Sequence, residues 1–434
     1  MKQTEFKRRR TQLMKMMGKN TIAILPSATQ QVRNRDVEFP FRQDSDFLYM
    51  TGFNEPDAVM VLMPGRKHGE YVLFCREKDP EKETWHGRRA GQEGAMENHG
   101  ADDSFPIDDI DDILPGLLEG TDAIFNVMGR YPDFDKRLIG WVSHIREQSR
   151  SGMHVPSEFV ALEYILHDMR LFKSREELRL MRKAAAISIE AHKQAMKTCS
   201  PGKHEFQIHA EFDYQFRKHN AEHAYPAIVG GGANGCILHY NDNNQPLNDG
   251  DLLLIDAGCE VEGYASDITR TFPVNGKYSP AQKEIYDIVL EAQHAAIRKV
   301  KPGNHWNDPH NAAVRVITKG LTSIKLLKGS PQKLIKEQAY RKFYMHRTGH
   351  WLGLDVHDVG DYKVGDQWRL LEPGMVLTIE PGIYIPAHSK SVHRKWWDIG
   401  IRIEDDVLVT KTGHEVLTEA LPKKVVDIEA LMAG

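Results

Sequence analysis

Residues 250–273 read GDLLLIDAGCEVEGYASDITRTFP and predict a β-hairpin that carries two aspartates. The apolar run LLLI lies between two glycines, which is typical of a short buried strand. A loop made of Val261 and Glu262 would place Asp256 and Asp267 directly opposite one another, with Cβ atoms about 4.5–5.5 Å apart. Two carboxylates at that distance repel unless one is protonated or a cation lies between them. A hairpin rim with two solvated acids is the alternative interpretation.

The composition is that of an ordinary globular protein. With 434 residues the chain is too long for one small core, and a net charge of −4 gives no basic excess to favour nucleic acid. No run of 18 or more apolar residues is present, so no membrane span is expected. The basic N-terminus lacks the apolar core of a signal peptide, which predicts a cytoplasmic protein. The cysteines lack metal-ligand spacing and are expected to be buried thiols: Cys75, Cys199, Cys236 and Cys259.

Residues 1–172 alternate predicted strands and helices, which indicates an α/β domain. Among the predicted strands are Phe47–Thr51 and Tyr71–Cys75. The charged, glycine-containing segment 78–112 is expected to be mostly loop.

Residues 173–434 are predicted to form a second, catalytic domain. Ser174 with Glu177 three residues later is a capping box, which opens a long helix at the start of this domain. The glycine-rich run at 230–235 lacks the trailing Lys-Ser/Thr of a phosphate loop, so nucleotide binding is excluded.

The second domain contains an internal repeat. Two helix pairs are each joined by Pro-Gly-x-His, at 201–204 and again at 302–305. Residues 250–258 (GDLLLIDAG) align without gaps on residues 374–382 (GMVLTIEPG), so both read G-x-x-L-x-I-acid-x-G. Two matches in the same order indicate a duplication, with Glu380 mirroring Asp256 across a pseudo-twofold axis.

Two further segments in the C-terminal part of the chain carry polar residues that could take part in catalysis or metal binding. Residues 346–358 read HRTGHWLGLDVHD, in which the glycines favour loop or strand over helix. In residues 398–406 (DIGIRIEDD) the isoleucines alternate on one face, and Arg402 and Glu404 share the other. A charged side chain inside a sheet is costly unless it is paired or bound to a metal.

Together these segments supply four carboxylates and one imidazole, from Asp256, Asp267, His350, Glu380 and Glu404. So much negative charge does not suit one buried site, but it suits two divalent cations bridged by carboxylates. Mostly oxygen ligands with one nitrogen favour Mn²⁺ or a similar hard ion over structural Zn²⁺.

These residues resemble the pita-bread metallopeptidases, in which the ligands follow the same order Asp, Asp, His, Glu, Glu. The resemblance covers the whole chain and is closest to the aminopeptidase P (Xaa-Pro aminopeptidase) family. Its further carriers are YASDITRTFP at 264–273, TIEPGIY at 378–384, GIRIED at 400–405 and FRQDSDFLYMTGFNEP at 41–56. It implies an N-terminal ribonuclease-H-like (creatinase-type) domain followed by a pita-bread domain with a pseudo-twofold duplication.

The resemblance also implies an activity, which is removal of the N-terminal residue from peptides with proline second. A metal-bridging hydroxide would attack the Xaa-Pro carbonyl, with Glu380 as proton acceptor and donor. His239 and His357 match histidines that contact the substrate and stabilise the oxyanion. His346 matches a histidine of the proline pocket.

Other matching positions imply supporting roles and an oligomer. Tyr384 and Arg402 match positions close to the metals, where Arg402 would orient carboxylates. Asp36, Trp85 and Arg150 resemble N-domain residues that reach a neighbouring subunit's active site in oligomeric members. The resemblance therefore implies a homo-oligomer, either a dimer or a tetramer.

Three alternatives share the same fold. Prolidase uses the same metals but accepts only Xaa-Pro dipeptides, and methionine aminopeptidase normally lacks such an N-terminal domain. A metal-free binding protein would have lost several ligands, whereas all five are present here. Hydrolysis of organophosphate esters, known in some relatives, is considered only as a side activity.

Overall fold

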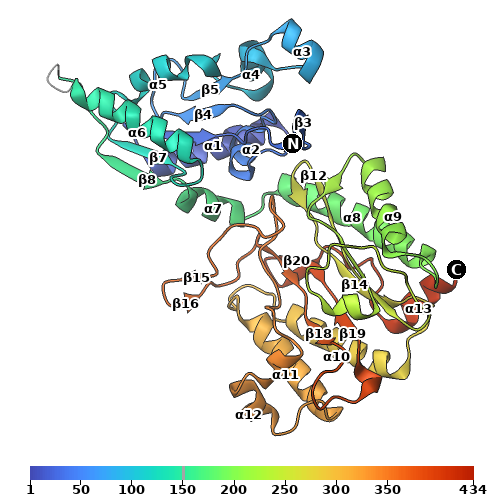
Figure 1. The fold of residues 1–434 in the computed structure, drawn as a ribbon. Coiled ribbons are helices and arrows are strands. Elements are labelled where there is room, and N and C mark those ends of the chain that lie inside the picture. Colours follow the sequence, from blue (N-terminus) through green and yellow to red (C-terminus); the bar gives the residue numbers. More distant parts are fainter. Residues whose placement is uncertain (149–151) are drawn as a thin grey trace. The chain divides into compact units, whose positions relative to one another are not determined.

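The computed structural model describes residues 1–148 and 152–434, and the chain divides into two compact units, Met1–Met169 and Arg170–Gly434. Figure 1 shows each unit as a mixture of helices and strands. The boundary predicted from the sequence lies at residues 172–173, close to this division.

The first unit is built on a six-stranded sheet in the order β6-β5-β4-β1-β7-β8. Its first three strands in the chain, β1, β4 and β5, form an antiparallel meander, whereas β6 runs parallel to β5, and β7 and β8 run parallel to β1. This is the predicted ribonuclease-H-like arrangement. The strands are β1 (Thr21–Pro26), β4 (Val59–Leu62), β5 (Tyr71–Cys75), β6 (Asp103–Pro106), β7 (Ala123–Asn126) and β8 (Glu158–Ala161).

Helices cover this sheet because its strands are apolar on both faces. Ile22 and Ile24 of β1 point to the same face, where they pack against α5 (Ile110–Leu118) and α6 (Pro132–Glu147). The first helix is α1 (Gln3–Met17), which buries Phe6, Leu13 and Met17. A small exposed hairpin, β2 (Val32–Asn34) and β3 (Val37–Glu38), lies outside the sheet.

Two expectations for this unit are wrong. The predicted strand Phe47–Thr51 belongs to helix α2 (Ser45–Thr51), because Asp44 caps the helix by accepting from the Phe47 amide at 3.0 Å. The segment 78–112, expected to be mostly loop, contains α3 (Pro80–His86), α4 (Gly91–His99) and β6. Asp79 at the N-cap and proline at the first position of α3 are helix start signals that the high charge of the segment concealed.

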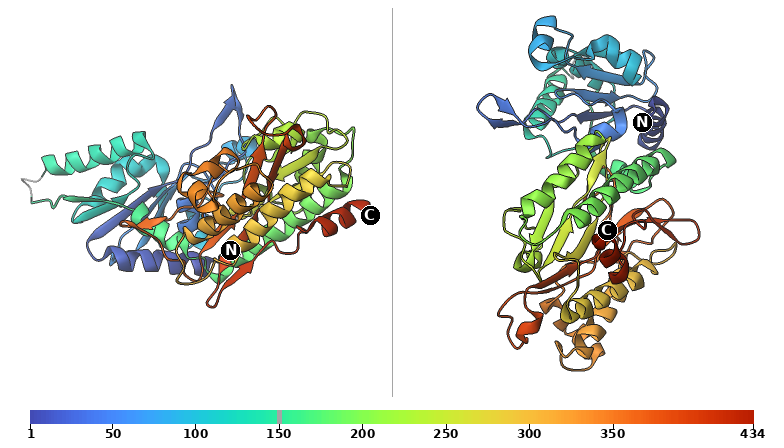
Figure 2. Two further views of the ribbon diagram at one scale, coloured as in Figure 1. Left: turned by 90° about the horizontal axis from the view of Figure 1, so that it is seen from below. Right: turned by 90° about the vertical axis from the view of Figure 1, so that its right-hand side faces the viewer.

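The second unit is organised around two pairs of helices, α8 on α9 and α10 on α11 (Figure 2). They are α8 (Arg175–Thr198), α9 (Glu205–Lys218), α10 (Pro280–Ile297) and α11 (Asp308–Ser323). The predicted capping box of Ser174 and Glu177 is present at the start of α8. In the part of the chain that the structure describes, every helix is too short or too polar to cross a membrane.

The strands of this unit form several small antiparallel sheets. One is β10 (Ile228–Gly231), β11 (Leu252–Asp256) and β14 (Thr269–Pro273), and another is β9 (Glu222–His223), β12 (Cys259–Val261) and β13 (Tyr264–Ala265). The second half contributes β17 (Val376–Ile379), β18 (Gly382–Ile385), β19 (Ile399–Arg402), β20 (Asp405–Val409) and β21 (His414–Val416). Smaller elements are β15 (Lys363–Val364), β16 (Gln367–Trp368), α12 (Pro331–Lys336) and α13 (Val425–Ala433), while α7 (Glu163–Leu171) spans the division between the units.

The predicted duplication is visible in the hydrogen bonds. The Gly202 amide donates to the Leu247 carbonyl at 2.9 Å, and the Gly303 amide donates to the Leu371 carbonyl at 3.1 Å. Each Pro-Gly turn is thus fastened to the segment that leads into the repeated strand, β11 in the first half and β17 in the second. The same local sequence therefore builds the same local structure twice.

The predicted register of the aspartate hairpin is wrong. The turn is Glu262-Gly263, with φ angles of 50° and 83°, so Val261 pairs with Tyr264. Two positive φ angles define the type I′ turn, which favours glycine at the second position. Asp256 consequently lies opposite Thr269, and Asp267 lies in the segment between β13 and β14.

Candidate metal centre

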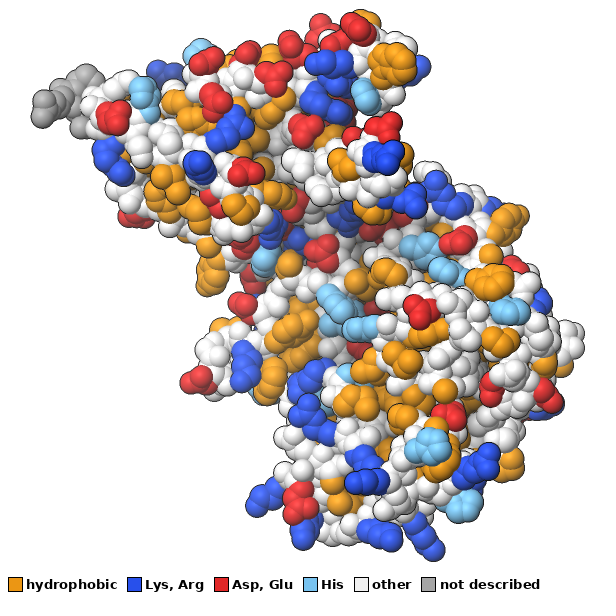
Figure 3. Space-filling model, viewed as in Figure 1, with side chains coloured by type: hydrophobic (Ala, Val, Ile, Leu, Met, Phe, Trp, Pro, Cys, Tyr) orange, Lys and Arg blue, Asp and Glu red, His pale blue; other side chains and the backbone are white. Residues whose placement is uncertain are grey.

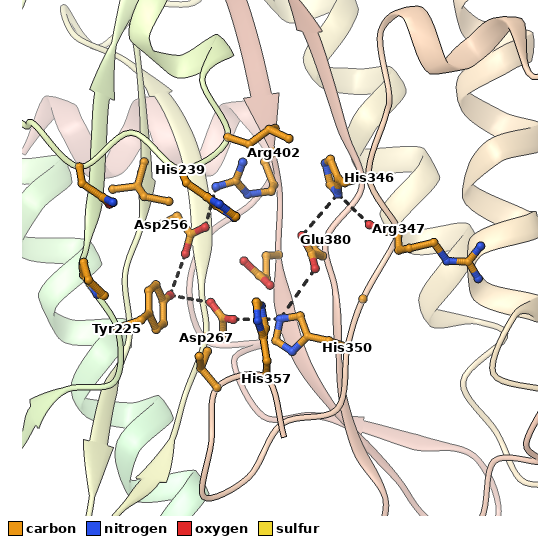
Figure 4. A pocket seen from close by; sticks show the side chains of 17 residues that line it. Tyr225, His239, Asp256, Asp267, His346, Arg347, His350, His357, Glu380 and Arg402 are labelled. Atoms are coloured by element: carbon orange, nitrogen blue, oxygen red, sulfur yellow. Dashed lines mark hydrogen bonds and ion pairs between the residues drawn. The ribbon is translucent and has the colours of Figure 1, made fainter. Parts of the chain in front are cut away.

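A cavity of about 460 Å³ in the second unit brings together most of the predicted site residues (Figure 4). Figure 3 shows histidine side chains gathered on the face of this unit that is turned to the viewer. The charged and aromatic polar residues that line the cavity are Tyr225, His239, Asp256, Asp267, His346, Arg347, His350, His357, Glu380, Arg402 and Glu404.

The five predicted ligands come from both halves of the duplication. They lie at strand ends or in the segments between strands, where the backbone is free to turn a side chain toward the cavity. Asp256 ends β11, Asp267 precedes β14, Glu380 follows β17, Glu404 lies between β19 and β20, and His350 lies in the loop before β15. The expectation that residues 346–358 avoid helix is confirmed.

Asp256 and Asp267 share a tyrosine. The Tyr225 hydroxyl lies 2.7 Å from Asp256 Oδ1 and 2.5 Å from Asp267 Oδ1, and it has one proton to donate. Arg402 Nη2 donates to Asp256 Oδ2 at 2.6 Å. Burial raises the pKa of Asp256, and the guanidinium opposes that shift only in part. One arginine therefore does not neutralise this pair of carboxylates.

His350 is oriented with one ring nitrogen toward the carboxylates. Its Nδ1 lies 2.9 Å from the Trp351 carbonyl, which accepts a hydrogen bond only from a protonated Nδ1. Nε2 then points to Asp267 Oδ2 at 3.3 Å and Glu380 Oε1 at 3.8 Å. Burial acts to lower the pKa of His350, but these carboxylates outweigh it and raise it to about 9. A histidine held in this way at its far nitrogen is the usual form of a metal-ligating imidazole.

The pKa values of the two glutamates show that the carboxylates of the site outnumber its positively charged side chains. Burial, with the neighbouring carboxylates in support, raises the pKa of Glu380 to about 7 and that of Glu404 well above its usual range. Ligand atoms of Asp267, His350 and Glu404 all lie within 4.8 Å of one another. Four buried carboxylates and one oriented imidazole fit divalent cations, because such ions supply the positive charge that the side chains alone do not.

Three further residues form a chain of hydrogen bonds beside the glutamates. Arg402 Nη1 donates to the Tyr384 hydroxyl at 2.9 Å, and that hydroxyl lies 2.9 Å from His346 Nε2. His346 Nδ1 lies 2.7 Å from the Arg347 carbonyl, so Nδ1 carries the proton and Nε2 accepts from Tyr384. Burial lowers the pKa of His346 to about 3, which keeps the ring neutral. Tyr384 is fully buried and does not itself line the cavity.

The two remaining histidines line the cavity without such a chain. The His357 ring packs edge-on against His350, with centroids 4.3 Å apart, and burial lowers its pKa. His239 lines the cavity near Leu238 and Asn241. The structure therefore brings together every predicted site residue of the catalytic domain.

The three predicted N-domain contacts are placed differently. Asp36 lies at the exposed turn between β2 and β3, and the Trp85 side chain on α3 is 79% exposed. Both belong to the first unit and do not line the cavity. Arg150 lies outside the described residues.

Several residues around the site were not predicted, and three of them hold proposed ligands through their side chains. Besides Tyr225, these are Thr269, which donates to Glu404 Oε2 at 2.6 Å, and Thr378, which accepts from the His350 amide at 3.1 Å. Both threonines lie two residues from a predicted ligand. Because residues i and i+2 of a strand point to the same face, this spacing could have indicated that they lie beside the ligands. Tyr225 lies in a loop before Pro226 and carries no such signal.

The comparisons with known proteins agree with this geometry. Residues 179–411 match the model of metallopeptidase family M24, and residues 6–125 match that of the aminopeptidase P N-terminal domain. The chain belongs to metallopeptidase family M24. The predicted resemblance and the predicted pita-bread fold behind a separate N-terminal domain are therefore confirmed.

Relatives of this M24 chain match it over nearly its full length. An Xaa-Pro aminopeptidase from Escherichia coli K12 is 46% identical, covering 99% of this chain and 98% of the relative. The solved structure of aminopeptidase PepP from Pseudomonas aeruginosa has 58% identity and a TM-score of 0.99, covering 100% and 98% of the two chains. Aminopeptidase P from E. coli with the inhibitor Pro-Leu has 45% identity and a TM-score of 0.97, covering 100% and 98%.

Replacing Gly349 by alanine is expected to lower activity and to destabilise the M24 domain. A Cβ at this position would lie 2.0 Å from the Thr378 carbonyl oxygen, so the loop that carries His350 would have to move away from β17. Such overpacking typically costs about 1–3 kcal/mol. Steady-state kinetics and thermal unfolding would measure both effects. Gly413→Ala is the matched control because nothing lies within 4 Å of its added Cβ, and an equal effect of both changes would contradict this account.

Proposed function

We propose that this protein is an Xaa-Pro aminopeptidase, which removes the N-terminal residue from peptides whose second residue is proline. The observation that carries the proposal is the cavity in which four carboxylates, four histidines and Arg402 converge. Full-length relatives carry the names Xaa-Pro aminopeptidase and aminopeptidase P, which favours this activity over others in the family.

The proposed metal ligands are Asp256, Asp267, His350, Glu380 and Glu404, and Mn²⁺ is the proposed ion because oxygen atoms dominate this set. Two such cations, when bound, would supply Lewis acidity that polarises a carbonyl and lowers the pKa of water. Arg402 and Thr269 hold Asp256 and Glu404 through hydrogen bonds of 2.6 Å each, which fixes the carboxylates before any ion arrives.

The chain's own residues would carry the protons and the charge. Glu380 lies between His346 and His350 in the cavity, where its carboxylate can take a proton from water and return it to the leaving nitrogen (Figure 4). His239 and His357 line the same cavity and can donate to the oxygen that gains charge as the carbonyl is attacked.

Recognition of proline has a physical basis in this cavity. An Xaa-Pro bond has no N–H group, so a site that needs this donor rejects it, and shape has to provide the selectivity. His346 is held rigidly by Tyr384 and the Arg347 carbonyl and, with Ile228, Leu238 and Val356, lines the cavity. We propose that these side chains line the pocket that binds the proline ring of the substrate.

The first unit is proposed to contribute to the assembly of subunits into a homo-oligomer. An exposed tryptophan such as Trp85 is unusual on a monomer surface, and aromatic residues are enriched at interfaces. We therefore assign Asp36, Trp85 and Arg150 to contacts with the active site of a neighbouring subunit in a dimer or tetramer.

The proposed location is the cytoplasm. It is supported by the four cysteines, none of which forms a disulfide bond.

A peptide-length assay with added Mn²⁺ tests the proposed activity. Release of the first residue is expected from an Xaa-Pro tripeptide and from a longer Xaa-Pro peptide, with none from the same peptides carrying alanine in place of proline. Activity confined to Xaa-Pro dipeptides would identify a prolidase instead. No activity on any of these peptides, with metal bound, would indicate a binding protein.

A further inference from the structure

A second cluster of side chains that could bind a metal lies on α9 and β9 and does not line the cavity. It consists of His209, Asp213 and His223, whose ligand atoms all lie within 4.8 Å of one another. The two imidazoles converge on one atom, since Asp213 Oδ1 lies 2.8 Å from His223 Nε2 and 3.9 Å from His209 Nε2. None of the three lines the cavity.

A tight turn between α9 and β9 brings the three side chains of this cluster together. His209 and Asp213 are four residues apart, so they lie on one helix face, while Phe212 and Phe216 are buried. Asn220 adopts a φ of 52°, and β9 then runs back along the helix. As a result, the His223 ring packs edge-on against Phe216, with centroids 4.7 Å apart.

We propose that His209, Asp213 and His223 form a second metal site, which binds a borderline ion of the Zn²⁺ class. Two imidazoles and one carboxylate suit Zn²⁺ or Ni²⁺, whereas Mn²⁺ and Mg²⁺ prefer oxygen ligands. The three side chains are about 28–60% exposed, so an ion has access and water can complete its coordination. Burial lowers the pKa of His209, which keeps this imidazole neutral and able to bind at pH 7.

An ion at this site would fasten α9 to the segment that enters the cavity. His223 pairs with Cys259 of β12, and the Ala224 amide donates to the Gly258 carbonyl at 3.0 Å. Tyr225, two residues beyond His223, contacts both Asp256 and Asp267. Occupancy of the second site would therefore restrain residues 222–225 and, with them, the tyrosine.

Metal analysis of the full-length protein tests the proposal. Protein saturated with Mn²⁺ is exposed to Zn²⁺, separated from free metal, and the total bound metal per chain is measured. We expect the wild type to retain about one ion per chain more than H209A/H223A, because the variant lacks the two imidazole ligands of the second site. Asp213→Asn, at the exposed member of the cluster, should also lose the extra ion and leaves both histidines in place.

His219→Ala is the matched control, because it removes an exposed histidine just beyond the same helix and should keep the wild-type total. Hydrogen exchange at residues 222–225 should slow on Zn²⁺ addition in the wild type and in H219A only. Equal metal totals in the wild type and Asp213→Asn would overturn the proposal, as would unchanged exchange. Because metal content and hydrogen exchange are measured without a peptide substrate, these results are independent of the peptide-length assay.

Discussion

Removing divalent metal from the protein with a chelator is expected to abolish peptidase activity and to lower thermal stability. Four carboxylates line the cavity, and the cationic side chains paired with them are Arg402 and His350, so divalent cations would supply the missing positive charge. A ligand that binds only the folded state stabilises it by about 2.7 kcal/mol when present at a hundred times its dissociation constant. Loss of the ions should therefore lower the melting temperature as well as the rate.

The measurement compares untreated, chelated and Mn²⁺-restored protein by peptide hydrolysis, metal content and thermal unfolding. Mn²⁺ should restore both activity and melting temperature, because hard ions of this kind prefer the oxygen-rich ligand set of the cavity. Chelator added together with excess Mn²⁺ is the control for direct effects of the chelator. Full activity in protein shown to be free of metal would contradict the proposed function.

Two of the proposed ligands could be placed from the sequence because they belong to a repeated motif. The matched motifs around Asp256 and Glu380 placed an acid at the end of two equivalent strands, β11 and β17, and the structure has both. Repetition of a local pattern is evidence about three-dimensional position that a single motif lacks. The capping box at Ser174 and the alternation before Glu404 were equally local, and local rules sufficed for them.

A turn position, a helix cap and a long-range contact account for what the sequence analysis missed. The register of the aspartate hairpin was wrong because it depends on which residues turn, and a glutamate at φ 50° before Gly263 was not anticipated. Helix α2 has a strand-like composition, but the cap at Asp44 and burial against the first unit's core decide its structure. Tyr225 was missed because its role arises only when a loop distant in sequence reaches both aspartates.

Replacing Glu380 by glutamine is expected to lower kcat by about 10²–10⁴-fold, which is the usual contribution of a positioned acid–base group. Glutamine keeps the shape of the side chain but neither takes up a proton nor offers a charged oxygen. The Glu380 amide donates to the Thr348 carbonyl at 2.8 Å, and this backbone contact survives the exchange. Any loss of activity then reports on the carboxylate itself.

Two separate measurements distinguish the roles assigned to this carboxylate. If Glu380 acts mainly on the proton, kcat falls while metal content and KM stay near their wild-type values. If it acts mainly as a ligand, bound metal falls as well, and excess Mn²⁺ recovers part of the rate. Glu372→Gln is the matched control, since it makes the same exchange at an exposed position on the approach to β17 and should leave kcat unchanged. Near-normal turnover by Glu380→Gln would remove this residue from the mechanism, because glutamine cannot take up the proton from water.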